Sequence, residues 1–213
     1  MEIVGADPPS TDQIRERHER LLGRLRLSAE ANGHDPDRLR IVAVTKTWPV
    51  EIARAATVAG LTRLGESRVQ EAEPKIEALP EAEWHFIGRL QSNKARLVDR
   101  LCELVHSVDS ASSARRLTVP TLVEVNLSGE ESKSGIPPEQ LADFLAAHPA
   151  RGLMTMPPAV DDPERSRPFF RRLRALAAEH GLPELSMGTS QDYRVAAEEG
   201  ATLVRVGSVL YRG

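Results

Sequence analysis

The sequence predicts a closed (β/α)8 barrel, an α/β fold of the TIM-barrel type, preceded by an N-terminal helix. Eight short apolar runs of strand length alternate with amphipathic runs of helix length along the 213 residues, and this alternation is typical of parallel sheets. No G-x-G-x-x-G motif follows any of these runs, so an open dinucleotide-binding sheet lacks its marker. We therefore expect residues 1–213 to form a single barrel domain of eight strand and helix units.

The first element is an amphipathic helix predicted over 11–33, with Ser10 and Gln13 at capping-box spacing. The strands predicted after it share a short run of β-branched or other apolar residues. They lie at 40–46, 62–67, 83–88, 103–110, 121–126, 151–156, 184–188 and 202–210.

The helices predicted between these strands share apolar residues at helical spacing. They lie at 48–60, 69–79, 93–104, 138–148, 163–180 and 191–200. Two connections, 111–120 and 144–151, leave little room for a helix. We expect the barrel to be irregular there.

Composition and charge exclude several classes of function. A net charge of −3 and 4% aromatic residues argue against nucleic-acid binding. No apolar stretch reaches membrane-spanning length, and the single Cys102 fits a reducing compartment, so we expect a cytoplasmic protein. The six histidines show no metal-binding spacing, so no metal site is predicted.

Lys46 is the leading candidate for chemistry, because active sites of such barrels lie at the carboxyl ends of the strands. The alternation of a strand places Lys46 on the same face as Val42 and Val44. Over an apolar barrel interior, desolvation would favour the neutral amine, which can condense with an aldehyde. The alternative is a strand-end lysine that reaches solvent.

Two loops of small residues follow the last two strands, and a phosphate site is often built there in barrels of this class. The alternative is that both are ordinary connectors. The candidate phosphate-binding residues are Ser186, Met187, Gly188, Thr189 and Ser190 in the first loop, and Gly207 and Ser208 in the second.

Two further polar residues stand inside apolar runs. Arg205 would point into the barrel if it shares a face with Leu203, where its guanidinium could donate to an unprotonated ring nitrogen. The alternative is an ion pair with Glu124. His85 alternates with two aromatic residues and would also face the interior, as a ligand contact or as a core histidine.

With these residues in place, the sequence resembles the pyridoxal 5′-phosphate homeostasis proteins, also called proline synthetase co-transcribed proteins, which look like an isolated N-terminal barrel of alanine racemase. The matching stretches span almost the whole chain. They are AVTKTWPVE at 43–51, GESRVQEA at 65–72, EWHFIGRLQSNK at 83–94, HSVDS at 106–110, EVNLSGEESKSG at 124–135, RGLMTM at 151–156, ELSMGTSQD at 184–192 and VRVGSVLYRG at 204–213.

The resemblance implies that Lys46 holds pyridoxal phosphate as a Schiff base, that the two loops bind its phosphate, and that Arg205 lies near the pyridine nitrogen. It also implies a monomer that controls the intracellular pool of this cofactor without established catalytic turnover, with pyridoxal-phosphate-dependent apoenzymes as candidate recipients. Ser67 stands where the family usually has Asn, so it becomes a candidate contact of shorter reach. Thr189 replaces a common Met.

The alternative function is a pyridoxal-phosphate-dependent amino-acid racemase. Racemases of the resembling fold take a second base from a C-terminal β domain and a partner subunit. The sequence ends at Gly213, directly after the eighth predicted strand, so we expect no source for that base and favour a carrier.

Overall fold

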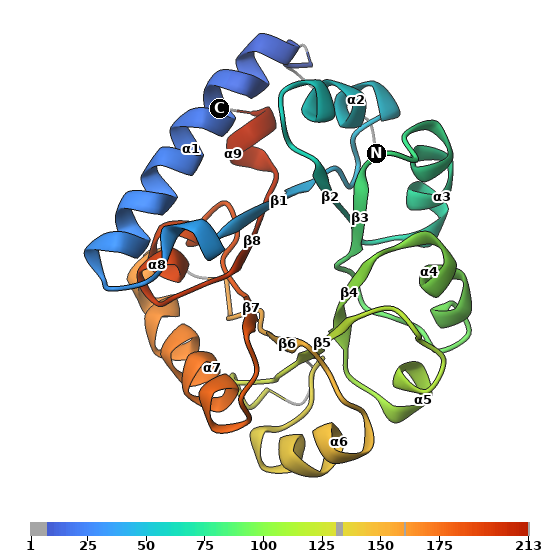
Figure 1. Ribbon diagram of the computed structural model, residues 1–213, viewed down its shortest axis with the longest axis vertical. Helices are drawn as coiled ribbons and strands as arrows, with labels where there is room; N and C mark the ends of the chain where they lie inside the picture. The colour runs from blue at the N-terminus through green and yellow to red at the C-terminus, as the bar shows by residue number, and fades with distance from the viewer. Residues whose placement is uncertain (1–7, 131–133, 160, 213) are drawn as a thin grey trace.

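In the computed structural model, which describes residues 8–130, 134–159 and 161–212, eight parallel strands close into a barrel because β8 pairs with β1. Helices surround the ring of strands (Figure 1). The predicted (β/α)8 fold is confirmed, and each predicted run contains a strand. The strands are β1 (Arg40–Val44), β2 (Arg63–Glu66), β3 (Glu83–Phe86), β4 (Leu104–Val108), β5 (Thr121–Glu124), β6 (Gly152–Met154), β7 (Glu184–Ser186) and β8 (Leu203–Val206).

The helices follow the strands in the predicted order. The α-helices are α1 (Thr11–Ala31), α2 (Val50–Val58), α3 (Val69–Ala78), α4 (Ala95–Leu101), α5 (Ala111–Ala114), α6 (Leu141–Ala147), α7 (Arg167–Glu179), α8 (Tyr193–Glu198) and α9 (Ser208–Tyr211). Short 3₁₀ turns lie at η1 (Pro36–Arg38), η2 (Pro138–Gln140) and η3 (Pro163–Ser166). Within the described ranges, no helix is both long and apolar enough to span a membrane.

The N-terminal helix α1 begins with the predicted capping box. The Ser10 hydroxyl accepts from the Gln13 N–H at 3.2 Å, and the Gln13 side-chain oxygen accepts from the Ser10 N–H at 2.9 Å. Its buried face, which includes Leu21 and Leu25, packs beside α8, α2 and α9, outside the ring of strands (Figure 1). The helix therefore covers the seam where the last strand meets the first.

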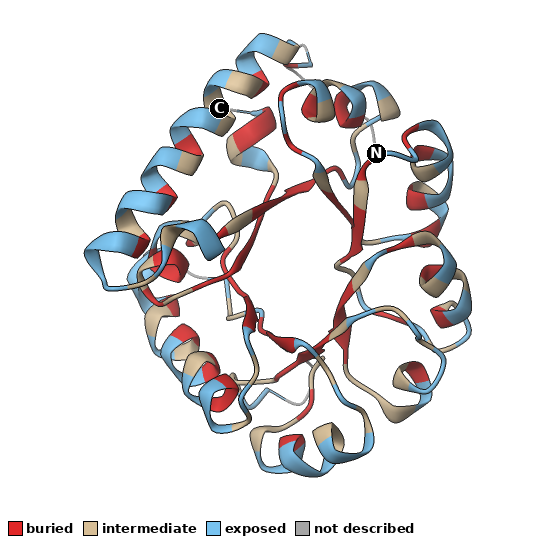
Figure 2. Ribbon diagram, in the orientation of Figure 1, coloured by how far each residue is buried: buried red, intermediate tan, exposed pale blue. Residues whose placement is uncertain are grey.

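The core has two layers, which follow from the alternation of side chains along each strand. Outward-facing residues such as Trp84 and Phe86 pack against the helices. The ring of strands is buried, while the helices are buried only on their inner faces (Figure 2). A smaller apolar cluster lies apart from that layer, consistent with the barrel interior, and consists of Val42, Leu122, Met154 and Leu203.

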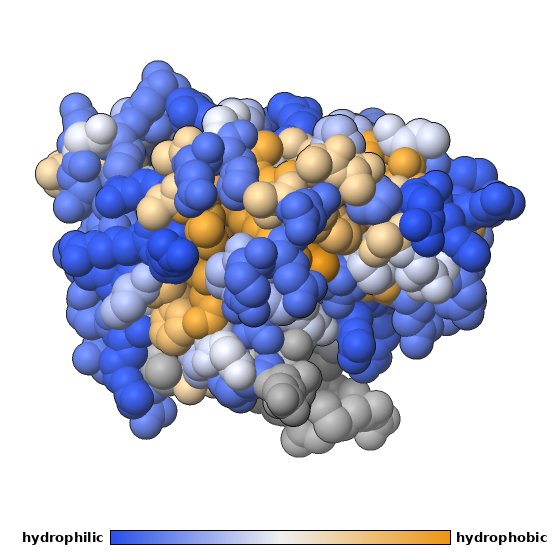
Figure 3. All heavy atoms as spheres, turned by 90° about the horizontal axis from the view of Figure 1, so that it is seen from below, coloured by the Kyte–Doolittle hydropathy of each residue, from blue (hydrophilic) through white to orange (hydrophobic). Residues whose placement is uncertain are grey.

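The barrel is irregular at the first of the two short connections, whereas β5 and β6, on either side of the second, pair in regular register. The pairing of β4 with β5 shifts register between Val105 and Val108, and α5 has only four residues. The helix α6 has seven residues, and its Phe144 and Leu145 are only partly buried. Apolar side chains gather on the face seen in Figure 3, which is the lower side of Figure 1, where α6 lies.

The last predicted strand, 202–210, is too long. Strand β8 ends at Val206, and α9 begins at Ser208. The Ser190 hydroxyl accepts from the N–H groups of Gly207 at 3.1 Å and Val209 at 3.4 Å, which turns the chain away from the sheet. Strand β1 likewise ends two residues before Lys46.

Candidate functional site

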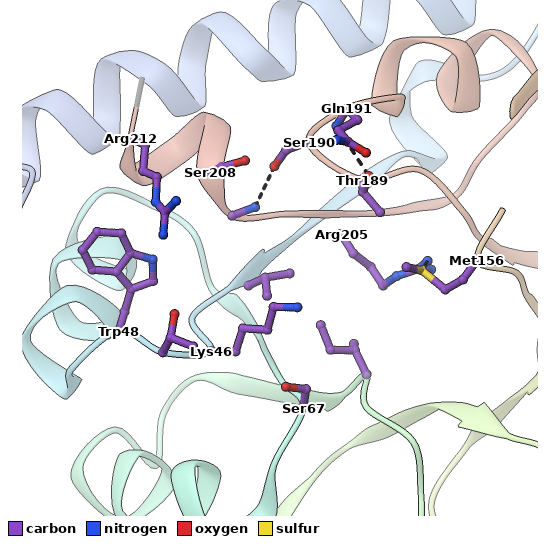
Figure 4. Close-up of a pocket in the computed structure, with 14 residues that line it drawn as sticks. Lys46, Trp48, Ser67, Met156, Thr189, Ser190, Gln191, Arg205, Ser208 and Arg212 are labelled. Carbon is purple, nitrogen blue, oxygen red and sulfur yellow. Dashed lines mark hydrogen bonds between the residues drawn. The ribbon is translucent and has the colours of Figure 1, made fainter. Parts of the chain in front are cut away.

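A pocket opens at the rim where the carboxyl ends of the strands meet, with a cavity volume of about 380 Å³. This volume lies within the usual range of small-molecule sites. Side chains from the segments after β1, β2, β6, β7 and β8 converge on it (Figure 4). Its lining residues are Val44, Lys46, Thr47, Trp48, Ser67, Ile87, Met156, Thr189, Ser190, Gln191, Arg205, Gly207, Ser208 and Arg212.

Lys46 lies in this pocket, with its amine directed toward the space between the loops (Figure 4). It occupies a turn after β1, where the Trp48 N–H donates to the Thr45 carbonyl oxygen at 3.0 Å. The expectation that Lys46 is desolvated over the barrel interior is wrong, because the residue is exposed. The turn lifts the side chain out of the strand and above the apolar interior.

The two predicted phosphate loops do meet at the pocket. Thr189 and Ser190 from the first loop, with Gly207 and Ser208 from the second, line the cavity. The hydroxyl of Ser190 joins the loops through its bond to the Gly207 N–H (Figure 4). Because it accepts there, its own proton is free to be donated to a ligand.

The other three residues of the first loop do not line the pocket. Ser186 and Met187 are fully buried, and Gly188 is buried as well. The Met187 N–H donates to the Leu203 carbonyl at 3.1 Å, and the Gly188 carbonyl accepts from the Arg205 N–H at 3.0 Å. Residues 186–188 therefore still run beside β8, beneath the loop.

Arg205 lies at the floor of the pocket and is buried. Its guanidinium donates to the Ser186 hydroxyl, to the Thr155 carbonyl at 3.1 Å and to the Met156 sulfur at 2.9 Å. The alternative of a direct ion pair with Glu124 is not found between these two described residues. Burial lowers the pKa of Arg205 to about 10, against the opposing field of Glu124, so the side chain remains a cation at neutral pH.

A chain of polar side chains crosses the barrel interior below Arg205. The Ser186 hydroxyl bonds to His106 Nδ1 at 2.7 Å, and His106 Nε2 bonds to His85 Nδ1 at 2.9 Å. His85 Nε2 reaches the Glu83 carboxylate at 3.0 Å. Since a carboxylate only accepts, His85 Nε2 donates to Glu83.

The surroundings of His106 in this chain shift its pKa. Burial, followed by the charges of His85 and Arg205, lowers the pKa of His106 well below its ordinary value. His85 is therefore a satisfied interior histidine, and it does not line the pocket. Through Ser186, the chain fixes where the Arg205 guanidinium points.

Ser67 lies in the pocket as expected, but several lining residues were missed. Trp48, Met156, Gln191 and Arg212 all project from loops. Trp48 follows the candidate lysine by two positions and packs against Tyr211, with 5.5 Å between the two ring centroids. Its aromatic side chain beside Lys46 was a signal in the sequence, whereas nothing in the sequence pattern marked Arg212.

The side chain of Asp192 does not cap α8. It occupies the N-cap position, but its carboxylate accepts from the Thr189 N–H at 2.7 Å and the Thr189 hydroxyl at 3.0 Å. These bonds shape the first loop instead of closing the helix. The motif at 124–135 cannot be placed in full, since residues 131–133 lie outside the described residues.

Two acidic residues stand at the same rim, after β4 and at the end of β5. Burial raises the pKa of Asp109. Burial, together with the charge of Asp109, raises the pKa of Glu124 to about 7. No group of three or more His, Cys, Asp or Glu side chains among the described residues is arranged to hold a metal ion.

Comparisons with known proteins agree with this architecture. The family model of the alanine racemase N-terminal domain matches residues 27–213. The pyridoxal phosphate homeostasis protein of Aquifex aeolicus is 40% identical, covering 92% of this chain and 96% of its own. The protein of the same name from Pseudomonas aeruginosa is also 40% identical, covering 93% of this chain and 94% of its own.

Solved structures show the same fold. PipY of Synechococcus elongatus, solved with pyridoxal phosphate bound, is 33% identical with a TM-score of 0.80, covering 93% of this chain and 99% of its own. Alanine racemase of Corynebacterium glutamicum is 19% identical with a TM-score of 0.68, covering 94% of this chain and 60% of its own. The latter likeness concerns the fold alone.

The raised pKa of Glu124 predicts that Glu124→Gln stabilises the protein at alkaline pH. The buried carboxylate is costly only when charged, so its penalty is small below the unfolded value of about 4.5 and grows until about pH 7. We expect a gain in unfolding free energy of roughly 3 kcal/mol near pH 8 and under about 1 kcal/mol near pH 5. Denaturant titrations at both pH values measure it, and an equal gain at both would contradict the assignment.

Proposed function

This chain belongs to the family of pyridoxal phosphate homeostasis proteins, and we propose that it binds pyridoxal 5′-phosphate through a Schiff base on Lys46 and serves as a carrier or regulator of that cofactor. The relatives are named homeostasis proteins rather than enzymes. One solved relative, PipY, holds pyridoxal phosphate. The pocket of this chain supports the same chemistry here.

The observation that carries the proposal is the set of groups around one cavity. A primary amine at Lys46, the hydroxyls of Ser190 and Ser208, and the guanidinium of Arg205 all line it. These groups match an aldehyde, a phosphate and a ring nitrogen, which are the reactive and polar parts of pyridoxal phosphate. The residues present therefore fit the cofactor.

The loops supply the donors that a phosphate needs. In the described part of the chain, no protein acceptor is recorded for the N–H groups of Ser190 and Ser208. The Ser208 hydroxyl is exposed at the pocket, at the start of α9. Backbone N–H groups and hydroxyls in such a turn bind an anion without a dedicated counter-charge.

Arg205 restricts the chemistry that a bound cofactor could support. Bound pyridoxal phosphate supplies an aldehyde that condenses with amines and, when its ring nitrogen is protonated, an electron sink. A guanidinium has donors and no acceptor, and Arg205 stays charged at neutral pH, so it can only donate to an unprotonated nitrogen. Its position favours holding the cofactor over carbanion chemistry, and the exposed Lys46 leaves the bond open to exchange.

Borohydride reduction followed by peptide mass mapping tests the Schiff base. We expect a pyridoxyl adduct on Lys46 in the wild type and in Lys94→Ala, and no adduct at this site in Lys46→Ala. An unmodified Lys46 after incubation with pyridoxal phosphate would sink the proposal. Racemisation of alanine at ordinary enzymatic rates, lost in Lys46→Ala, would replace the carrier with the racemase.

The phosphate assignment predicts that Ser208→Ala and Ser190→Ala each weaken cofactor retention by a few-fold to about tenfold, the scale of one hydrogen bond to a charged group. Equilibrium dialysis with pyridoxal phosphate measures the change. Ser92→Ala, on the same rim but outside the cavity lining, serves as the control. Unchanged retention in the Ser190 and Ser208 double variant would place the phosphate elsewhere.

A further inference from the structure

The turn that carries Lys46 is strained. The Trp48 N–H bonds to the Thr45 carbonyl at 3.0 Å, which makes Lys46 and Thr47 the two central residues of the turn. Thr47 has a φ of 66°, and no other non-glycine residue in the described ranges has a positive φ. Turns with this geometry normally take Gly or Asn there, and a β-branched residue in this region costs about 1–2 kcal/mol.

Such a conformation persists only where the surrounding structure enforces it. Here the unit formed by β2 and α3 contacts both neighbours of Lys46. After the lysine, the Thr47 N–H donates to the Glu71 carboxylate at 3.0 Å. Before it, the Thr45 carbonyl accepts from Lys75 Nζ at 2.8 Å.

The second contact depends on a buried ion pair. Lys75 and Glu66 are both buried, and Lys75 Nζ lies 2.5 Å from a Glu66 carboxylate oxygen. The same oxygen accepts from the Thr45 hydroxyl at 2.6 Å, while the other oxygen of Glu66 has no hydrogen-bond partner. A buried ion pair that leaves one oxygen unpaired is weak evidence for stability, so its placement calls for another reason.

We infer that Glu71 and Lys75 are positioning residues that hold the Thr45–Trp48 turn in its strained form, so that the Lys46 amine is directed into the pocket before any ligand binds. This inference rests on the proposed function, since it assigns the two residues to the bond that Lys46 forms. Neither residue is required to touch the ligand. They raise the affinity because they order Lys46 in advance. Without them, the entropic cost of ordering Lys46 would reduce the free energy of binding.

Glu71 is the residue to vary first. Its pKa is lowered chiefly by the hydrogen bond from the Thr47 N–H, so the carboxylate is charged at neutral pH, and its other oxygen accepts from Arg68 at 2.9 Å. It is part-exposed, whereas removing Lys75 would leave Glu66 buried and unpaired. Glu73, exposed on the same helix, provides a matched control.

Two ligands separate positioning from general damage to the pocket. Pyridoxal phosphate uses both the Lys46 bond and the phosphate loops, whereas pyridoxine 5′-phosphate has an alcohol in place of the aldehyde and uses the loops alone. We expect Glu71→Ala to weaken the binding of pyridoxal phosphate roughly three- to tenfold, which is the scale of one hydrogen bond to a charged group. We expect the affinity for pyridoxine 5′-phosphate to change by less than about twofold. Glu73→Ala should change the affinity for neither ligand.

A second background tests the strain itself. Glycine adopts a positive φ without cost. In the Thr47→Gly background, Glu71→Ala should therefore weaken the binding of pyridoxal phosphate by less than it does in the wild-type background. Equal loss of both ligands in Glu71→Ala, or no loss of either, would overturn the inference. Wild-type protein that forms no reducible bond on Lys46 would instead refute the proposed function, so the two failures are distinguishable.

Discussion

The pairing of the last strand with the first is the interaction on which the site depends. In β1 and β8, Val42 lies beside Arg205 and Ala43 beside Val206. Lys46 and Ser208 are far apart in the sequence, yet this register sets them on the same stretch of rim. Closure also leaves no free sheet edge and brings α1 over the seam. Without it, the amine and the second loop would belong to opposite edges of an open sheet.

Below the rim, the interior combines an apolar ring with one polar chain. Val42, Leu122, Met154 and Leu203 fill space, while the chain from Glu83 to Arg205 satisfies every polar group that it buries. A network of this kind stabilises one arrangement, because any broken link leaves a buried group unpaired. The guanidinium at the top of the chain is consequently held in place from beneath.

The sequence predicted the barrel because the apolar residues of strands and helices recur with different periods. It predicted that Lys46 lies in the candidate site because active sites of such barrels lie at the carboxyl ends of the strands. It misplaced what depends on turns. The apolar residues Val209 and Leu210 made the last predicted strand too long. They belong to α9, and the Val209 N–H donates to the Ser190 hydroxyl of another loop. Lys46 is exposed in a turn after β1, and no pattern of apolar residues predicts that turn or the positive φ of Thr47 within it. The contact between His85 and His106 joins two strands whose register the sequence did not define.

We propose Lys46 as the attachment point, the loops at 189–190 and 207–208 as the phosphate site, and Arg205 as the partner of the ring nitrogen. Lys46 is the only lysine among the residues that line the described pocket. A crystal structure of the protein with pyridoxal phosphate is the most direct test. We predict continuous density from Lys46 Nζ to the cofactor, with the phosphate between Ser190 and Ser208 and the ring nitrogen at Arg205. A cofactor attached to another lysine, or a phosphate outside these loops, would contradict the account.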